Sequence, residues 1–275
     1  MKKPNTVVLI HGLWMTPRCW DPFAQYLQRT GYQVHRPAWP RLHGDPENMR
    51  KSPEALAGLG VLEIADHYEK FVRSLPEPPI LIGHSFGGLI VEILLDRGLG
   101  VAGVAIDATA PKGVYRLPFA QLRAASPVLS NPFNYRRTVM LTLDQFRYAF
   151  ANTMSEAAAR QAYDRDAIPG PGRPLFQAAF ANFLPNAATK VDYRNGKRAP
   201  LLLIGGAQDH TVPASVCRSA FRKYKSARAV TEYKEFPDRC HLLITQDGWE
   251  EVADYAITWA TTNFQHWSPQ AVVAA

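Results

Sequence analysis

The 275 residues include 31 Lys and Arg against 24 Asp and Glu, and 47% of them are apolar while only 20% are charged. A chain of this length and composition can bury one large core, and its charge density is far too low for a disordered protein. Its longest apolar runs are much shorter than the ~20 residues of a bilayer-spanning helix, so the sequence predicts no membrane span.

Short apolar runs rich in β-forming residues alternate with longer segments of helical period in the first 112 residues. This alternation is typical of βαβ units around a parallel sheet, and continuous apolar strands are expected where both faces of a sheet are covered. We therefore predict an α/β fold with a mostly parallel central sheet flanked by helices. The expected strands are Thr6 to His11, Tyr32 to Arg36, Pro79 to Gly83, Gly103 to Ile106, Pro200 to Gly205 and Val230 to Phe236.

Four amphipathic segments are expected to pack as helices on this sheet. The first is expected to begin with Asp21 as its N-cap, with Pro22 in the first turn and Gly31 closing it. The second follows Ser52–Pro53 and places its apolar stripe on Leu62, Ala65, Tyr68, Phe71, Val72 and Leu75. The third begins after Ser85, and the last begins near Trp249.

The pattern changes between residues 114 and 196, where helical periods are separated by Pro and Gly without a convincing strand. We predict a helical cap here, inserted into a core formed by residues 1–113 and 197–265, with a loose tail at 266–275. Thr142 with Gln145 predicts a capping box, and Ser155 is a candidate N-cap. Seven Phe residues fall in this segment, and most of them are expected to pack the cap onto itself and onto the sheet.

Three further properties limit the possible partners. The cysteines are odd in number and lack metal-ligand spacing, which predicts reduced thiols rather than disulfides or a zinc site. The apolar stretch after Lys2 and Lys3 is too short for a signal peptide, so we expect a cytoplasmic protein. The net charge is +7, but the only dense basic run is residues 222–225, on an expected surface helix, so no nucleic-acid partner is predicted.

The sequence Gly83-His84-Ser85-Phe86-Gly87 lies directly between an expected strand and an expected helix. A G-x-S-x-G turn in this position holds its serine in a strained conformation and presents the hydroxyl, while side chains in place of the two glycines would collide with neighbouring backbone. Because a serine hydroxyl is a weak nucleophile at neutral pH, it needs a base and a group that orients the base. Ser85 is therefore a candidate nucleophile.

Both partners can be found downstream in the sequence. Asp209 follows one expected strand, and His241 follows the next after a short loop, which gives the chain order Ser85, Asp209, His241. Asp107 also follows an expected strand and is the alternative acid, its other role being a hydrogen bond within a loop. His11, His84, His210 and Cys240 are more typical of structural or supporting positions, and Asp238 of an exposed loop.

This order of nucleophile, acid and histidine resembles that of the α/β-hydrolase superfamily. His11-Gly12-Leu13-Trp14 after the first strand matches that family's H-G-x oxyanion motif, and Asp209 opens a D-x-x-V-P element. The resemblance covers essentially the whole chain. It implies that Ser85 attacks, that His241 transfers the proton, that Asp209 orients His241, and that the backbone N–H groups of Leu13 and Phe86 stabilise the oxyanion.

The chemistry that the resemblance implies is cofactor-independent serine esterase or lipase-like hydrolysis. The aromatic-rich cap predicts a small to medium-sized, moderately apolar acyl or alcohol group. Trp14 and His84 are candidate pocket residues. No Walker loop, dinucleotide fingerprint or zinc helix is present, so no cofactor or metal is predicted. Fold alone does not exclude a perhydrolase, a C–C bond hydrolase, an acyltransferase or a ligand receptor with vestigial hydrolysis. The oligomeric state stays undetermined.

Overall fold

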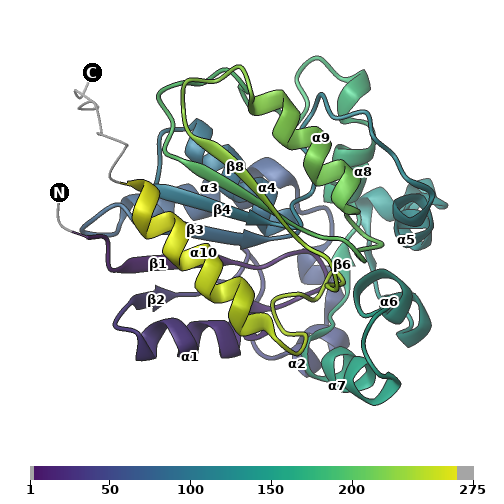
Figure 1. Ribbon diagram of the computed structural model, residues 1–275. Coiled ribbons are helices and arrows are strands. Elements are labelled where there is room, and N and C mark those ends of the chain that lie inside the picture. Colours follow the sequence, from purple (N-terminus) through teal and green to yellow (C-terminus); the bar gives the residue numbers. More distant parts are fainter. Residues whose placement is uncertain (1–2, 265–275) are drawn as a thin grey trace.

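The computed structural model describes residues 3–264, and its centre is a six-stranded sheet (Figure 1). The strand order is β2-β1-β3-β4-β7-β8, and every neighbouring pair is parallel. This confirms the predicted α/β class and a mostly parallel sheet. The six strands are β1 (Thr6–Ile10), β2 (Gln33–His35), β3 (Ile80–His84), β4 (Ala102–Ile106), β7 (Leu201–Gly206) and β8 (Thr231–Phe236).

Helices cover both faces of this sheet, which is why the residues of β1, β3, β4 and β7 are all buried. Helices α1 and α10 pack against each other on one face, while α3, α4 and α9 pack on the other (Figure 1). Their bounds are α1 (Asp21–Arg29), α3 (Val61–Arg73), α4 (Phe86–Asp96), α9 (Ala214–Tyr224) and α10 (Trp249–Asn263), with the short α2 (Pro46–Lys51) between β2 and α3.

The chain between β4 and β7 carries four helices beyond the carboxyl ends of the strands, at the right of Figure 1. The capping box of Thr142 with Gln145 and the N-cap Ser155 are both present. A short antiparallel pair of strands, β5 with β6, also lies in this segment, although the sequence indicated no strand there. The elements are α5 (Phe119–Leu129), β5 (Thr138–Val139), α6 (Leu143–Phe150), α7 (Glu156–Asp166), β6 (Gly170–Pro171) and α8 (Arg173–Ala179).

Two details of the predicted helices are wrong. Trp20 and not Asp21 is the N-cap of α1, because a 3-10 turn over Pro17–Trp20 runs directly into the helix and leaves Asp21 as its first residue. The segment after Ser52 forms a 3-10 turn, Pro53–Leu56, and α3 begins only after Gly60. Leu62 consequently points to solvent.

Of the seven Phe residues between 114 and 196, only Phe146 and Phe150 are buried. Most of this group was expected to pack inward, so that expectation is wrong. The exposed members are Phe119, Phe133, Phe180 and Phe183. Residues 266–275, predicted to be a loose tail, lie outside the described residues. Within residues 3–264, no helix combines the length and the apolarity that crossing a bilayer requires.

Candidate active site

Ser85 occupies a sharp turn between β3 and α4. Its backbone has φ +58° and ψ −121°, a conformation that a residue with a side chain adopts only when its surroundings enforce it. Hydrogen bonds hold the turn in place: the Ser85 N–H donates to the carbonyl of Ile106 at 2.9 Å, and the Ser85 carbonyl accepts from Thr109 N–H at 3.1 Å. The end of the neighbouring strand β4 and the loop that follows it therefore hold the strained residue through both its N–H and its carbonyl.

The two flanking glycines of this turn permit its close packing. A Cβ atom on Gly83 would lie 2.1 Å from the carbonyl oxygen of Gly87, and one on Gly87 would lie 2.0 Å from the carbonyl oxygen of Ile10. Both distances are far inside van der Waals contact. The steric reason predicted for the glycines of the motif is therefore present in the structure, and it brings the chain after β1 against the turn.

Asp209 and His241 meet at the carboxyl ends of β7 and β8. Asp209 Oδ2 lies 2.6 Å from His241 Nδ1, and both side chains are buried. The other carboxylate oxygen, Oδ1, accepts from the N–H groups of Thr211 at 2.6 Å and Val212 at 2.9 Å. These bonds fix the carboxylate, which in turn selects the tautomer of His241 with its proton on Nδ1.

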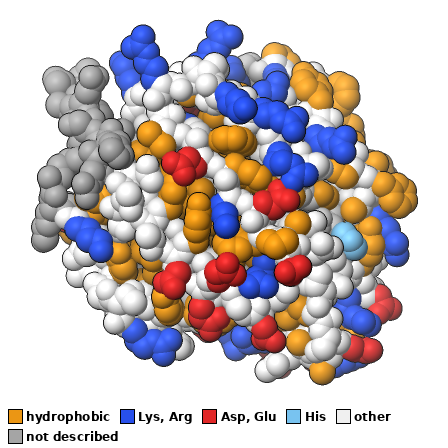
Figure 2. All heavy atoms as spheres, in the orientation of Figure 1, with side chains coloured by type: hydrophobic (Ala, Val, Ile, Leu, Met, Phe, Trp, Pro, Cys, Tyr) orange, Lys and Arg blue, Asp and Glu red, His pale blue; other side chains and the backbone are white. Residues whose placement is uncertain are grey.

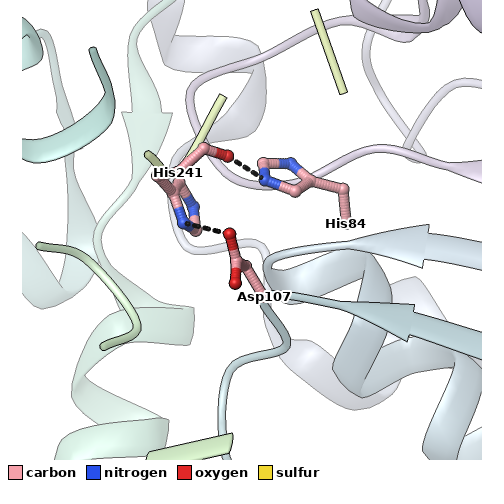
Figure 3. A group of neighbouring side chains, drawn as sticks. All are labelled: His84, Asp107 and His241. Atoms are coloured by element: carbon pink, nitrogen blue, oxygen red, sulfur yellow. Dashed lines mark hydrogen bonds and ion pairs between the residues drawn. The ribbon is translucent and has the colours of Figure 1, made fainter. Parts of the chain in front are cut away.

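The Nε2 atom of His241 is buried and has no hydrogen-bond partner among the described residues. No hydrogen bond joins it to Ser85 Oγ in this structure. His84, the residue before Ser85, donates from Nε2 to the backbone carbonyl of His241 at 2.7 Å, and the two rings lie 4.6 Å apart between centroids (Figure 3). His241 therefore contacts the residue that precedes the strained serine, and its Nε2 is left as an acceptor without a partner in the described part of the chain.

His84 was expected to line the substrate pocket, but it does not. The ring is fully buried between Trp20 and His241, where its Nε2–H satisfies a backbone carbonyl. Burial, reinforced by the nearby His241, lowers the pKa of His84 well below its usual range. His84 is therefore a neutral group that supports the backbone of His241.

Asp107, the alternative acid, lies in the same cluster as His241 (Figure 3). Its Oδ2 is 3.9 Å from His241 Nδ1, which is beyond hydrogen-bond distance, and its Oδ1 accepts from Gly206 N–H at 2.7 Å. Burial, together with the charge of Asp209, raises the pKa of Asp107 well above its usual range. The geometry therefore favours Asp209 as the residue that orients His241.

His84, Asp107 and His241 offer ligand atoms within 4.8 Å of one another, a grouping that could hold a metal ion. Hydrogen bonds already engage two of the ring nitrogens, because His241 Nδ1 faces Asp209 and His84 Nε2 faces a backbone carbonyl. Hydrogen bonds therefore hold these two histidines and orient the imidazole of His241.

The loop after β1 passes directly over Ser85. A Cβ on Gly12 would lie 2.7 Å from Ser85 Cβ and 3.3 Å from Ser85 Oγ, which places the next residue, Leu13, beside the hydroxyl. Phe86 is the first residue of α4, so its N–H has no partner within the helix and lies at the positive end of the helix dipole. Both predicted oxyanion donors therefore belong to segments that adjoin Ser85.

A cavity of about 340 Å³ opens onto Ser85. Trp14 and Phe86 line it beside the serine, as predicted for Trp14, and its outer part is formed by α5, α8 and the chain around them. Most of the lining is apolar. Phe150, which sequence reasoning did not single out, packs its ring edge-on against His241 with 4.9 Å between centroids. Phe150 is the last residue of α6, and nothing in the local sequence indicated that it would contact His241.

The other histidines and the cysteines considered from the sequence are held in hydrogen bonds to other groups or are buried. His11 donates from Nδ1 to Gly12 O and accepts from Trp39 N–H at Nε2, and burial lowers its pKa to about 4. His210 bonds to the carbonyl of Tyr148 at 2.9 Å. The three cysteines are free and buried, and burial raises the pKa of Cys240. None of these groups contacts Ser85 Oγ through a described hydrogen bond.

Residues 7–255 match the model of the alpha/beta hydrolase family. The chain belongs to this family. Its fold is similar to that of a monoacylglycerol lipase from Paleococcus ferrophilus, at 22% identity and a TM-score of 0.66, with 95% of this chain and 96% of the lipase covered. Tomato Methylketone Synthase I, solved with 2-tridecanone, has a TM-score of 0.69 at 15% identity, with 94% and 99% of the two chains covered.

An extracellular α/β-hydrolase from a Paenibacillus species is similar in the same way, with 22% identity, a TM-score of 0.65 and coverage of 94% and 99%. Among curated proteins, a carbendazim-hydrolysing esterase from Nocardioides sp. (strain SG-4G) is 29% identical over 94 residues. That match spans 33% of this chain and 35% of the esterase. These relatives are esterase and lipase-like hydrolases for the most part, and the structural ones establish the shared fold.

Proposed function

We propose that this protein is a serine hydrolase that cleaves carboxylic esters of small to medium apolar substrates through an acyl-enzyme on Ser85. The observation that carries the proposal is the 2.6 Å contact between Asp209 Oδ2 and His241 Nδ1, with His241 held by His84, the residue before a serine at φ +58°. A buried carboxylate that fixes an imidazole, next to a strained and presented hydroxyl, is the arrangement that activates serine.

The reaction follows from the roles of these atoms. Ser85 Oγ attacks the acyl carbon while its proton passes to His241 Nε2, the nitrogen that has no other partner. The negative charge moves to the acyl oxygen, where the N–H groups of Leu13 and Phe86 stabilise it. When the tetrahedral species collapses, the ester C–O bond breaks and His241 returns the proton to the leaving alkoxide. Water, deprotonated by His241, then releases the acid.

The substrate class is inferred from the cavity. Its volume of about 340 Å³ and mostly apolar lining suit an acyl or alcohol group of modest size. We propose that residues 114–196 act as a cap, because α5 and α8 form the outer part of this cavity. The similarity to a carbendazim-hydrolysing esterase and to the fold of a monoacylglycerol lipase agrees with ester substrates. A cytoplasmic location stays a prediction, which cell fractionation tests.

Labelling with a fluorophosphonate tests the nucleophile, and a panel of esters with increasing acyl length tests the substrate class. Wild-type protein is expected to be labelled, Ser85→Ala not at all, and His241→Ala only weakly. Ser226→Ala, an exposed serine far along the chain, is the matched control and should label like wild type. Labelling that persists in Ser85→Ala, or faster hydrolysis of long triglycerides than of soluble short esters, would contradict the proposal.

A further inference from the structure

Large apolar side chains are exposed around the opening of the cavity. Of the ten exposed large hydrophobic residues within residues 3–264, nine fall between Tyr115 and Leu184. Phe119 is 78% exposed and Phe183 is 81% exposed. Monomeric soluble proteins rarely expose so many large apolar side chains in one region unless that region binds a protein, a membrane or a ligand. We call this set the mouth rim: Tyr115, Leu117, Phe119, Leu122, Phe133, Tyr135, Phe180, Phe183 and Leu184.

Part of the mouth rim is connected through ring contacts and reaches the cavity. The rings of Tyr135 and Phe176 lie 5.9 Å apart, those of Phe176 and Phe180 6.3 Å, and those of Phe180 and Phe183 6.5 Å. Phe183 also lines the cavity, as do Tyr115, Leu117 and Leu122 of the mouth rim. An apolar path therefore leads from the outer surface to the space above Ser85.

In the segments that carry the mouth rim and in the neighbouring α9, all Asp, Glu, Lys and Arg positions are Lys or Arg. Residues 108–143, 167–191 and 210–231 contain no Asp or Glu, whereas the rest of the chain has 19 Lys and Arg against 24 Asp and Glu. The whole net positive charge of the protein thus originates in these three segments. Their basic residues are Lys112, Arg116, Arg123, Arg136, Arg137, Arg173, Lys190, Arg218, Arg222, Lys223, Lys225 and Arg228.

Several of these cations lie directly against the mouth rim. Lys223 Nζ is 5.8 Å from the centre of the Tyr115 ring, and Arg137 is 6.0 Å from that of Phe133. Lys112 donates to the carbonyl of Pro185 at 3.0 Å and to that of Leu184. In Figure 2, Lys and Arg side chains gather over α9 and hydrophobic side chains crowd the adjoining edge, whereas acidic side chains lie mostly in the middle and lower part.

We propose that the mouth rim docks on the surface of an anionic lipid membrane. The exposed rings would enter the interfacial region of the bilayer while the surrounding Lys and Arg side chains contact lipid phosphates. Burial of apolar surface and electrostatic attraction to anionic lipids would then both favour binding. A second copy of this chain is a poorer occupant, because a symmetric dimer through this face would bring two positive surfaces together. The proposal does not depend on the chemistry assigned to Ser85.

Vesicle co-sedimentation tests the docking surface, with wild type and with Ser85→Ala to exclude turnover of lipid. The probes are phosphatidylcholine vesicles with and without phosphatidylglycerol, at low and high NaCl. We expect binding to the anionic vesicles that salt weakens, and little binding to phosphatidylcholine alone. Absence of binding to the anionic vesicles at low salt would overturn the proposal.

Matched variants locate the contact. Arg136→Glu with Lys223→Glu, and separately Phe119→Ser with Phe180→Ser, should each weaken binding by roughly tenfold or more. Arg29→Glu with Lys70→Glu on α1 and α3, and Leu62→Ser, are the controls and should bind like wild type. The changed mouth-rim residues do not line the cavity, so hydrolysis of a soluble short ester should persist and report intact folding.

Two outcomes would contradict the assignment of this surface. One is equal loss of vesicle binding in the mouth-rim and control variants, which would indicate a general charge effect. The other is a dimer in light scattering that the Phe119→Ser, Phe180→Ser variant converts to monomer, which would make the mouth rim a contact between copies. Failure of ester hydrolysis with retained vesicle binding would affect only the proposed function.

Discussion

The indole Nε1 of Trp14 donates a hydrogen bond to the carbonyl oxygen of Val139 at 2.9 Å. Trp14 also accepts at its own carbonyl from Ile168 N–H at 2.9 Å. Val139 belongs to β5, and Ile168 lies just before β6, so the small sheet between β4 and β7 holds the loop after β1 from two sides. That loop carries Leu13, the proposed oxyanion donor, and Trp14 itself has a strained φ of +65°.

Trp14→Phe should therefore lower kcat while the fold persists. Phenylalanine keeps the apolar contact with Phe150 but removes the N–H that reaches Val139. A small displacement of a catalytic group reduces rate, and we expect a loss of roughly tenfold in kcat. Ester kinetics measure it. Trp259→Phe on α10, whose Nε1 has no described partner, is the control. Equal kinetics in both variants would argue against this positioning role.

Asp209→Asn and Asp107→Asn are expected to behave differently. Loss of the charge that orients His241 should reduce kcat by roughly 10³- to 10⁴-fold, as in other triads. Burial and the charge of Asp209 raise the pKa of Asp107, and Asp107 makes no hydrogen bond to His241, so a neutral amide there should cost much less activity. Steady-state kinetics of both variants decide the point. Normal turnover in Asp209→Asn with loss in Asp107→Asn would reassign the acid.

Gly12→Ala should impair activity more than stability. The added methyl group would press on Ser85 Cβ at 2.7 Å and move the oxyanion loop away from the hydroxyl. Gly58→Ala is the control, since its Cβ meets nothing within 4 Å but its φ of +72° costs roughly 1 kcal/mol for a residue with a side chain. We expect the control to lose stability in urea unfolding with unchanged kcat. The opposite pattern would refute the close approach of Gly12.

The contribution of Glu92 to the free energy of unfolding should fall as pH rises from about 4.5 to about 8. Burial raises the pKa of Glu92 from 4.5 to about 8, against the opposing effects of the Tyr224 hydroxyl at 2.6 Å and of Arg198. In this pH window the folded state holds a proton that the unfolded state has lost, so stability is greatest below the unfolded pKa and declines toward the folded one.

Glu92→Gln tests this pH dependence, because the amide can still accept from Tyr224 but does not titrate. Urea unfolding of wild type and variant between pH 5 and pH 8 should give a steeper decline with pH for the wild type. The difference between the two slopes isolates the contribution of Glu92 from that of the other titrating groups. Parallel slopes would show that Glu92 does not titrate in this range.

Most secondary structure could be predicted because it depends on local patterns. Buried parallel strands are continuous apolar runs, and the capping box of Thr142 is encoded within four residues. The misplaced start of α3 shows the limit of that approach. A helical turn does begin at Pro53, but it ends at Leu56, and α3 starts only after Gly60. No local signal in the sequence distinguished this 3-10 turn from the start of a full helix.

By itself the sequence determined the strained serine motif, the chain order of Ser85, Asp209 and His241, and the α/β class, because each depends on residue types at fixed spacing. Only the tertiary structure gave the distances that favour Asp209 over Asp107, because both follow strands and they differ in a distance of 2.6 Å against 3.9 Å to His241 Nδ1. It also decided that Phe183 faces water and Phe150 faces His241. Those outcomes depend on how segments far apart in the chain pack together, which periodicity within one segment does not encode.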